Sequence, residues 1–510
     1  MNPIRRAARL ALAALAAVVA SFALAVPAAA TSYVPIADRD LAAQAEVIAL
    51  VDVVAVEPGP ADAMPATDYL VAADELVQGY LPGSTVVVRV PGGMRADGIG
   101  LEIEGAPALA VGEKALLFLN ANEDGSYSIL HLMLGAFHAR AAAGAVIAEQ
   151  DLDGAVSLAG PAKQEGGRRD LARFVAWLAD RAAGVQREAD YWVRGSRTTA
   201  PQEKAFAYYG TSDGISPRWF GFDGGGRAGW RVQSSGQPGL GFDATAAAVQ
   251  AAMEAWDADP TSAISYTYDG TTTATGGLTS NDGVDAFVFG DPHGTAAGTF
   301  DCNHGGVLAV GGSWYWSSTR DYRGRAYHEV VESDVVVNDG TECFFAGNPA
   351  GAAEVFAHEL GHTLGFGHAS DPQSLMFPNV HNDGRGARLG EDDRVGASVV
   401  YGDGSYQPAP SGGAGSGGAT QAFTVAASRT TQTTIDLAWT ASFADVASFR
   451  VELVGKKGSF QVLATAGGDE TSVTVGGFKK NQLVTLRVTA LRADGAVAGA
   501  SNTLKVRTKK

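Results

Sequence analysis

The segment from His358 to His368 constrains this chain more than any other, because it reads His-Glu-Leu-Gly-His-Thr-Leu-Gly-Phe-Gly-His. Residues 351–364 carry apolar side chains at helical spacing and contain no proline, which predicts a helix. On that helix His358 and His362 lie on the same face, one turn apart. Gly365 then allows the chain to leave the helix through a left-handed turn, which returns His368 toward the other two histidines.

Three neutral imidazoles leave a zinc ion its double positive charge and an open fourth position for water, which is the arrangement of a catalytic site. Glu359 lies between the first two histidines and can reach a metal-bound water as a general base. The alternative is a helix with core or surface histidines, whose ring nitrogens would then need other partners. The segment therefore predicts that His358, His362 and His368 bind zinc and that Glu359 is the catalytic residue.

This motif resembles that of the metzincin peptidases, in its matrixin form. Residues 374–378, Ser-Leu-Met-Phe-Pro, are similar to the matrixin Met-turn, with Met376 as its methionine. Residues 389–396 and the pair Tyr401-Gly402 resemble the last helix and the closing residues of matrixin catalytic domains.

Upstream, residues 247–256 resemble the first long helix of that domain, and residues 306–338 resemble its substrate-binding strand region. The resemblance covers about residues 204–404. It implies an α+β metzincin-type catalytic domain with a mixed twisted sheet and an active-site helix. It also implies that Met376 forms an apolar floor under the histidines, and that substrate pairs with an exposed sheet edge within residues 306–314.

Two features depart from the matrixin pattern. No cysteine precedes Cys302, so a pro-region cysteine cannot cap the zinc. The histidine that helps to hold a second, structural zinc in many matrixins is missing, because residues 308–311 read Leu-Ala-Val-Gly. His293 and His304 lie nearby and are expected to be ordinary loop residues.

The two cysteines of the chain, Cys302 and Cys343, both fall in the catalytic region. In an oxidising compartment they can form a disulfide, closing a loop of about 41 residues worth roughly 4 kcal/mol on the chain-entropy account. Two free thiols or zinc ligands are the alternative, and three histidines already satisfy the catalytic site.

Residues 1–30 have the organisation of a secretory signal peptide. Arg5, Arg6 and Arg9 precede an apolar stretch, residues 10–26, and Ala28-Ala29-Ala30 offers a small-residue cleavage site. A membrane anchor is the alternative, but this run is short and rich in alanine. We expect no membrane span after signal removal and a secreted protein in the extracellular or another extracytoplasmic space.

The formal net charge of −17 disfavours nucleic acid as a partner, because an acidic surface repels phosphate. It is compatible with a structural calcium ion, which matrixin-like domains often carry. Four aspartates in a glycine-rich region offer oxygen ligands: Asp282, Asp285, Asp291 and Asp301. No EF-hand spacing is present, so solvated loop acids are the alternative for each of them.

Residues 31–160 read as an N-terminal all-β domain, a small barrel or sandwich, in which His131 and His138 are expected to be structural. Strands are predicted over residues 47–56, 69–76, 85–90, 114–119 and 127–134. This domain fits either a removable pro-region or a stable accessory domain. A helical and polar connector, residues 161–203, follows it, with a helix predicted over residues 170–183. An aspartate of the connector is one candidate for capping the zinc in a latent form.

A Gly/Ser linker at residues 405–420 separates the catalytic region from residues 421–510. The alternating strands beyond it, with Trp439 as the core tryptophan, resemble a fibronectin type III module, which implies a C-terminal β-sandwich. Val484 stands where such modules usually have their corner tyrosine. Modules of this kind act as spacers or bind a protein or glycan ligand.

The function predicted by these patterns is a secreted zinc-dependent endopeptidase that hydrolyses peptide bonds of protein or peptide substrates. One rival is a catalytically inactive adhesin on a peptidase scaffold, which predicts the loss of a ligand or of Glu359, and neither is lost. Another rival is a zinc hydrolase that acts on something other than peptides.

Overall fold

The computed structural model describes most of the chain from Ser32 onward. The described residues are 32–61, 64–142, 144–152, 168–193, 206–208, 210–211, 213–369, 371–404, 406, 421–440, 446, 448–454, 460–467, 470–491, 497–501 and 504–509. They fall into two compact units, with the boundary between Tyr406 and Gln407, and each unit is described by itself. The predicted signal peptide and the Gly/Ser-rich part of the linker lie outside the described residues. The chain is a multidomain, β-rich protein.

Five N-terminal strands close into a barrel: β2 (Val47–Pro58), β3 (Ala66–Gln78), β4 (Thr85–Pro91), β7 (Lys114–Ala121) and β8 (Tyr127–Ile129). They follow the order β7-β2-β3-β4-β8, and β8 also pairs with β7. Every second side chain of β2 from Val47 to Val53 points into one apolar core. Ile48 and Leu50 between them belong to a second core, so this part of the strand is buried on both faces. The sheet continues beyond β7 through β9 (Ala136–Ala142), β10 (Ala145–Glu149) and β11 (Arg168–Asp170).

The strand predicted over residues 127–134 is wrong in its second half. It ends at Ile129, and the 3₁₀ helix η1 (Leu132–Gly135) follows. His131 and Leu132 have φ angles of 54° and 53°, a left-handed backbone that cannot continue a strand. The predicted connector helix is present as α3 (Leu171–Ala182), where the Asp170 side chain caps the N-terminus by accepting from the Arg173 amide.

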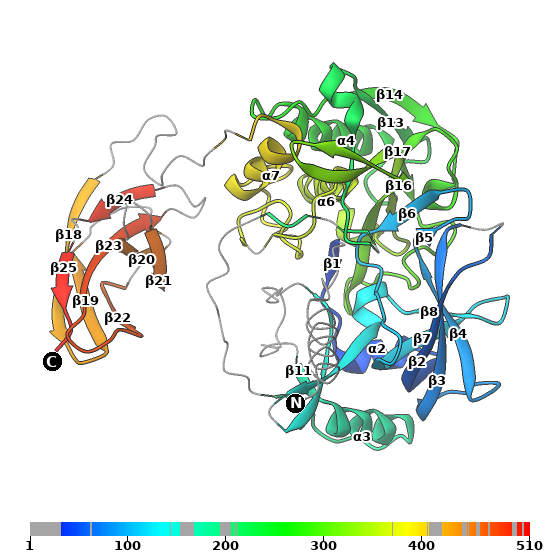
Figure 1. Ribbon diagram of the computed structural model, residues 1–510, viewed down its shortest axis with the longest axis horizontal. Coiled ribbons are helices and arrows are strands. Elements are labelled where there is room, and N and C mark those ends of the chain that lie inside the picture. The colour runs from blue at the N-terminus through cyan, green and yellow to red at the C-terminus, as the bar shows by residue number, and fades with distance from the viewer. Residues whose placement is uncertain are drawn as a thin grey trace, which may run out of the picture. The chain divides into compact units, whose positions relative to one another are not determined.

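A mixed nine-stranded sheet positions the site. Its main order is β14 (Tyr266–Thr272), β13 (Ala228–Gln233), β15 (Asp285–Phe289), β17 (Arg325–Val337), β16 (Gly306–Tyr322), β6 (Ile99–Ile103) and β5 (Gly93–Met94). Two short strands join it at the side, β1 (Ser32–Val34) on β16 and β12 (Pro217–Arg218) on β17. Figure 1 shows β1 and β6, in blue, reaching from the N-terminal part of the chain to the green strand β16.

The sheet edge that was expected to be exposed is therefore covered. All residues of β16 from Gly306 to Tyr315 are buried. Gly306, Val307 and Ala309 pair with β1, and residues 312–316 pair with β6. Both partner strands belong to the same chain, which no local pattern in the sequence indicated.

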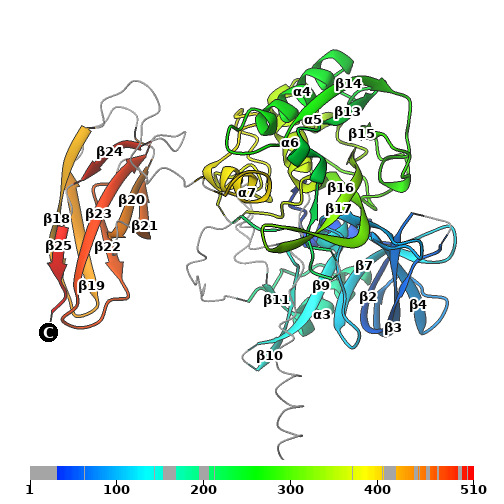
Figure 2. The same cartoon turned by 45° about the horizontal axis from the view of Figure 1, so that its top comes forward.

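The helices of the catalytic region are α4 (Phe242–Asp257), α5 (Glu342–Phe345), α6 (Pro349–Thr363) and α7 (Glu391–Tyr401), with the 3₁₀ helices η2 (Phe220–Gly224) and η3 (Gly277–Thr279). The predicted active-site helix is confirmed as α6. Pro349 occupies its first turn, and the Asn348 side chain caps it by accepting from the Gly351 amide. Helix α4 packs against α6, and Trp256 Nε1 donates to the Ala357 carbonyl at 2.9 Å. Figure 2 shows α4, α5 and α6 together above β16 and β17.

The α2 helix (Asp38–Gln44) follows β1 and belongs to a second apolar core that both halves of this unit share. From the N-terminal part this core takes Leu116, Phe118, Phe137, Phe174 and Trp177, from the sheet Val288, Val310, Trp314 and Val336, and from η3 Leu278. Burial of this common surface stabilises the two halves as one body, because apolar area is removed from water on both sides.

The second unit contains strands in two sets that share β18. The strands are β18 (Gln421–Thr430), β19 (Thr434–Thr440), β20 (Ser448–Val454), β21 (Phe460–Gly467), β22 (Ser472–Gly476), β23 (Leu483–Leu491), β24 (Val497–Ser501) and β25 (Leu504–Arg507). The first residues of β18 pair with β24, and the later ones pair with β19. Trp439 is buried with its ring 5.2 Å from that of Phe449.

Among the described residues, no helix is both long enough and apolar enough to cross a bilayer.

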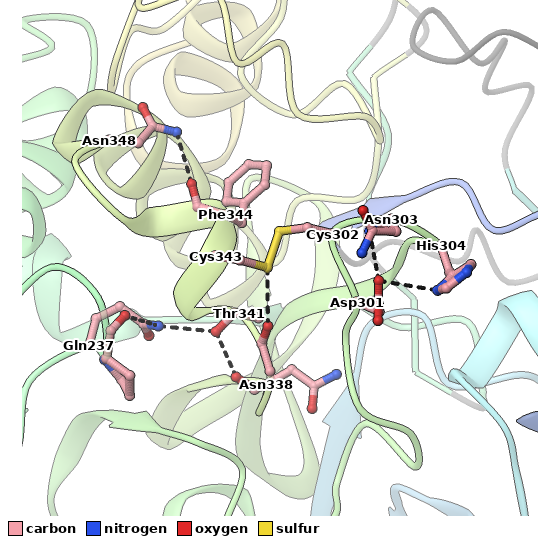
Figure 3. The surroundings of a disulfide bond; sticks show 12 residues. Gln237, Asp301, Cys302, Asn303, His304, Asn338, Thr341, Cys343, Phe344 and Asn348 are labelled. Carbon is pink, nitrogen blue, oxygen red and sulfur yellow. Dashed lines mark hydrogen bonds and ion pairs between the residues drawn. A yellow bond between two sulfur atoms is a disulfide. The ribbon is translucent and has the colours of Figure 1, made fainter.

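Cys302 and Cys343 form a disulfide with a Cα–Cα distance of 6.3 Å, as predicted. The bond links the loop before β16 to α5 (Figure 3). Nearby, Thr341 Oγ1 donates to the Asn338 carbonyl and accepts from Gln237 Nε2, so the α5 side of the bond is also held by hydrogen bonds.

We expect the paired substitutions Cys302→Ser and Cys343→Ser to lower the free energy of unfolding by about 4 kcal/mol, from the entropy of a loop spanning 41 residues. Urea unfolding followed by tryptophan fluorescence measures this change. Because the chain has two cysteines, reduction of the unsubstituted protein should give the same loss. Equal midpoints for the oxidised and reduced protein would contradict the prediction.

Candidate metal centre

Three buried histidines meet at the C-terminal end of α6. The helix places His358 and His362 one turn apart, with ring centroids 4.6 Å from each other. Gly365, at φ 88°, turns the chain so that the His368 ring lies 5.1 Å from His358 and 5.4 Å from His362. Within the described part of the chain, these three form the one group of His, Cys, Asp or Glu side chains close enough to hold an ion together.

Hydrogen bonds orient two of the rings. His358 Nδ1 lies 2.7 Å from the Leu375 carbonyl, and His362 Nδ1 lies 2.8 Å from the Phe366 carbonyl. A carbonyl only accepts, so each Nδ1 carries the proton and each Nε2 presents a lone pair. Burial also lowers the pKa of His358 to about 4 and that of His362 well below its ordinary value, which keeps both rings neutral.

The inward nitrogens fit a cation. His358 Nε2 and His368 Nε2 are 3.2 Å apart, and His362 Nε2 is buried without a hydrogen-bond partner. Buried acceptors that face one another are costly unless a positive charge lies between them. Three imidazole nitrogens are a donor set that suits zinc.

Glu359 is fully buried beside the histidines. Burial raises the pKa of its carboxyl to about 8, and a bound dication would act in the opposite direction. Its Oε1 accepts a hydrogen bond of 3.0 Å from the backbone N–H of Ser32, and its Oε2 is buried without a partner.

Met376 packs under α6. A Cβ added to Gly361 would lie 2.2 Å from Met376 Sδ, so the glycine in the His-Glu-Leu-Gly-His run makes room for the methionine. The Met376 carbonyl accepts from the Ala369 amide at 2.8 Å, which joins this turn to the loop that carries His368. The sequence predicted Met376 under the histidines. The need for glycine at position 361 follows from the packing of Met376 against the helix.

Asp393 of α7 holds the turn around Met376 and was missed as a functional residue. Its Oδ1 accepts from Ser374 Oγ and the Met376 amide, and its Oδ2 accepts from the amides of Leu375 and Gly390, both at 2.6 Å. Because the Leu375 carbonyl orients His358, Asp393 acts on the centre through this turn. The signal in the sequence was the acidic run at residues 391–393, which also fits an ordinary helix start.

Glu354 of α6 fastens the loop that follows the turn. It accepts from the His381 amide at 2.7 Å and lies 2.6 Å from His381 Nδ1. The loop after Met376 is therefore tied to the same helix that carries the histidines.

The other histidines singled out in the sequence lie elsewhere. His131 Nε2 bonds Gln44 Oε1 at 3.0 Å, and burial lowers the pKa of His131 to about 4. His138 Nδ1 lies 2.5 Å from Glu113 Oε1. His304 is exposed and pairs with Asp301 at 3.2 Å.

Each of the four aspartates proposed as calcium ligands accepts a backbone N–H: Asp282 from Val284, Asp285 from Ser333, Asp291 from Thr295 and Ala296, and Asp301 from Asn303. Two of them, Asp282 and Asp285, lie near further carboxylates, those of Glu332 and Asp334. Burial, with Glu332 and Asp285 as like-charged neighbours, raises the pKa of Asp334.

We expect Asp393→Asn to cost about 2–4 kcal/mol, because an amide NH₂ group would replace one acceptor oxygen and face two buried donors. Disorder of the turn that orients His358 should also weaken zinc binding about 10–100-fold. Urea unfolding and a zinc titration against a competing chelator measure the two effects. Glu391→Gln, at the exposed start of the same helix, is the control. Unchanged zinc affinity in Asp393→Asn would disprove the role.

Comparison with known proteins identifies the region around this centre. The matrixin family model matches residues 226–402. Matrilysin from Homo sapiens is 48% identical over 46 residues, which cover 9% of this chain and 17% of that protein. Neutrophil collagenase from Homo sapiens is 42% identical over 59 residues, covering 11% of this chain and 13% of that protein. The chain thus spans less than a fifth of the length of these relatives, and it contains a matrixin-like domain.

A solved fibronectin type III domain of human fibronectin type III domain containing protein 3 aligns with 19% of this chain and 92% of its own chain. The sequence identity is 17% and the TM-score is 0.16.

Proposed function

We propose that this protein is a secreted zinc-dependent endopeptidase that hydrolyses peptide bonds of protein substrates. The observation that carries the proposal is the set of three buried imidazoles whose ring nitrogens lie close enough to hold one ion, with Glu359 buried on the helix that carries two of them. The matrixin match over residues 226–402 includes all four residues.

His358, His362 and His368 are the residues that would hold the zinc ion. When bound, zinc supplies a Lewis acid that lowers the pKa of a bound water and polarises the scissile carbonyl. The chain supplies the rest. Hydrogen bonds to the Leu375 and Phe366 carbonyls keep the lone pairs of His358 and His362 directed at the ion.

Glu359 moves the protons of the reaction. As general base it accepts a proton from the attacking water, and it then gives a proton to the nitrogen of the departing amine. Support comes from the two carboxylate oxygens: Oε2 is free, and Oε1 lies 3.0 Å from a peptide nitrogen, within reach of such a transfer.

The substrate binds as an added strand between β16 and the loop after Met376. Backbone hydrogen bonds to β16 would hold the peptide extended, and side-chain pockets would select its residues. The composition of residues 379–388 does not favour a particular side chain.

The remaining assignments are part of the same proposal. The signal peptide at residues 1–30 directs secretion, and the C-terminal module at residues 421–510 is a fibronectin type III-like β-sandwich with a protein or glycan ligand. We also propose that residues 31–160, 161–203, 204–404 and 405–420 are the β-rich domain, the connector, the peptidase domain and the linker.

Glu359→Gln should lower kcat/KM on casein by about 10²–10⁴-fold, because proton transfer is lost while the three zinc ligands remain. The measurement uses a chain that begins at Ile36. This chain lacks Ser32, whose amide donates a hydrogen bond to Glu359. Zinc content by atomic absorption shows whether the metal is retained, and Glu329→Gln, on the exposed side of β17, is the matched control.

Removal of zinc by a chelator should also abolish cleavage, and added zinc should restore it. An unsubstituted chain from Ile36 that binds zinc and cuts neither protein nor peptide would favour the adhesin alternative. Hydrolysis of small esters without peptide cleavage would favour the other hydrolase.

A structural calcium ion remains a prediction from the acidic region around Asp282 and Asp285. Calcium at about 100 times its Kd should stabilise the folded protein by about 2.7 kcal/mol, visible as a higher Tm. Thermal unfolding in calcium, with magnesium as the comparison, tests this. A Tm that does not respond to millimolar calcium would eliminate the site.

A further inference from the structure

We infer that the chain carries its own inhibitor: Ser32–Val34 occupies the substrate groove of the metal centre and keeps the enzyme latent. The inference rests on the proposed peptidase function and names how that site is regulated. The contact needs no pro-region cysteine, and the chain has none before Cys302.

The first observation is contact with the catalytic residue. The Ser32 amide donates to Glu359 Oε1 at 3.0 Å, across 327 positions of sequence. Ser32 is 1% exposed, so the segment fills the space beside Glu359. A substrate and Ser32 could not occupy this place together.

The second observation is pairing with both walls of the groove. On one side β1 is antiparallel to β16, with Ser32 opposite Ala309 and Val34 opposite Gly306. On the other side Tyr33 forms a parallel bridge with Asn379, in the loop after Met376. The segment is therefore a strand inserted between the edge strand and the wall loop, which is the mode expected of an extended peptide substrate.

The third observation is the register of this strand. In the proposed mechanism Glu359 gives a proton to the nitrogen of the departing amine, and the nitrogen that lies on Glu359 belongs to Ser32. Ser32–Val34 therefore occupies the subsites on the amine side of the scissile bond. Signal cleavage after Ala30, as the sequence predicts, would leave Thr31 alone ahead of Ser32, so the processed chain resembles a bound product.

The segment is anchored immediately behind the groove. Asp38, at the start of α2, is buried and accepts from Arg169 Nε at 2.9 Å and Nη2 at 2.6 Å. The Tyr191 hydroxyl donates to the same carboxylate at 2.8 Å. Because β1 is joined to this anchor through a few residues, it stays at high effective concentration in the groove.

A second anchor holds the N-terminal part on the sheet. Strand β6 pairs with β16 from Ile103 opposite Gly312 to Ile99 opposite Trp316. The His131 ring also packs on the start of β16, where a Cβ added to Gly306 would lie 2.8 Å from its Cε1. A single cut in the connector before Phe206 would therefore leave the segment in place, and activation requires removal of the N-terminal part.

The test compares the chain from Thr31 with a chain that begins at Ile36 and so lacks β1 but keeps both anchors. We expect the shorter chain to show a kcat/KM on a fluorogenic peptide about 100-fold higher, the scale on which a tethered ligand outcompetes a free one. Ser32→Pro removes the donor to Glu359 without shortening the chain and should raise activity in the same direction. Tyr80→Ala, on the exposed surface of the N-terminal part, is the control and should remain latent.

Two further readouts separate this inference from the proposed activity. A fluorescent peptide hydroxamate should bind the zinc-loaded shorter chain about 100-fold more tightly than the full chain, whether or not it cuts peptides. Amide hydrogen exchange at residues 306–309 should accelerate when β1 is absent, with or without zinc.

Tighter hydroxamate binding without peptide cleavage would support the groove segment and reject the peptidase. Equal hydroxamate affinity and equal exchange in the two chains would overturn the inference. Full activity of the chain from Thr31, after an engineered cut in the connector alone, would overturn the claim that both anchors keep the segment bound.

Discussion

Strand pairing along both edges of β16 holds the first unit together. On one side β16 pairs with β17 and completes the matrixin-like sheet, and on the other it pairs with β1 and β6 from the N-terminal part. In the proposed peptidase the same strand forms one wall of the substrate groove and the surface on which the N-terminal part docks. Its residues from Gly306 to Tyr315 are buried, so access to the metal centre would depend on which strand lies along this second side.

The centre itself depends on a short relay of backbone contacts. Asp393 fixes the turn at Leu375, the Leu375 carbonyl fixes the His358 ring, and Gly361 leaves room for Met376 beneath the helix. These hydrogen bonds and this packing contact fix the positions of the side chains, which pre-arranges the ligands before metal binds. Glu354 extends the same control to the wall loop through His381.

Local sequence patterns were sufficient for the helix of the centre, because its apolar spacing, the separation of His358 and His362 and the turn at Gly365 are each set by neighbouring residues. The disulfide was also predictable, since two cysteines permit one pairing. Long-range partners were not: β1 is three residues long and has no periodicity, and the role of Asp393 depends on which amides the fold brings to it. The expectation of an exposed edge at β16 failed for the same reason.

The apolar core shared by the two halves has a consequence for the lifetime of the active enzyme. Leu278, Val310, Trp314 and Val336 are covered by side chains of the N-terminal part. Its removal would expose a contiguous apolar face, which favours aggregation and degradation. Removal of the N-terminal part would then both activate the enzyme and expose the surface that leads to its loss. The period of proteolysis would be limited for this reason.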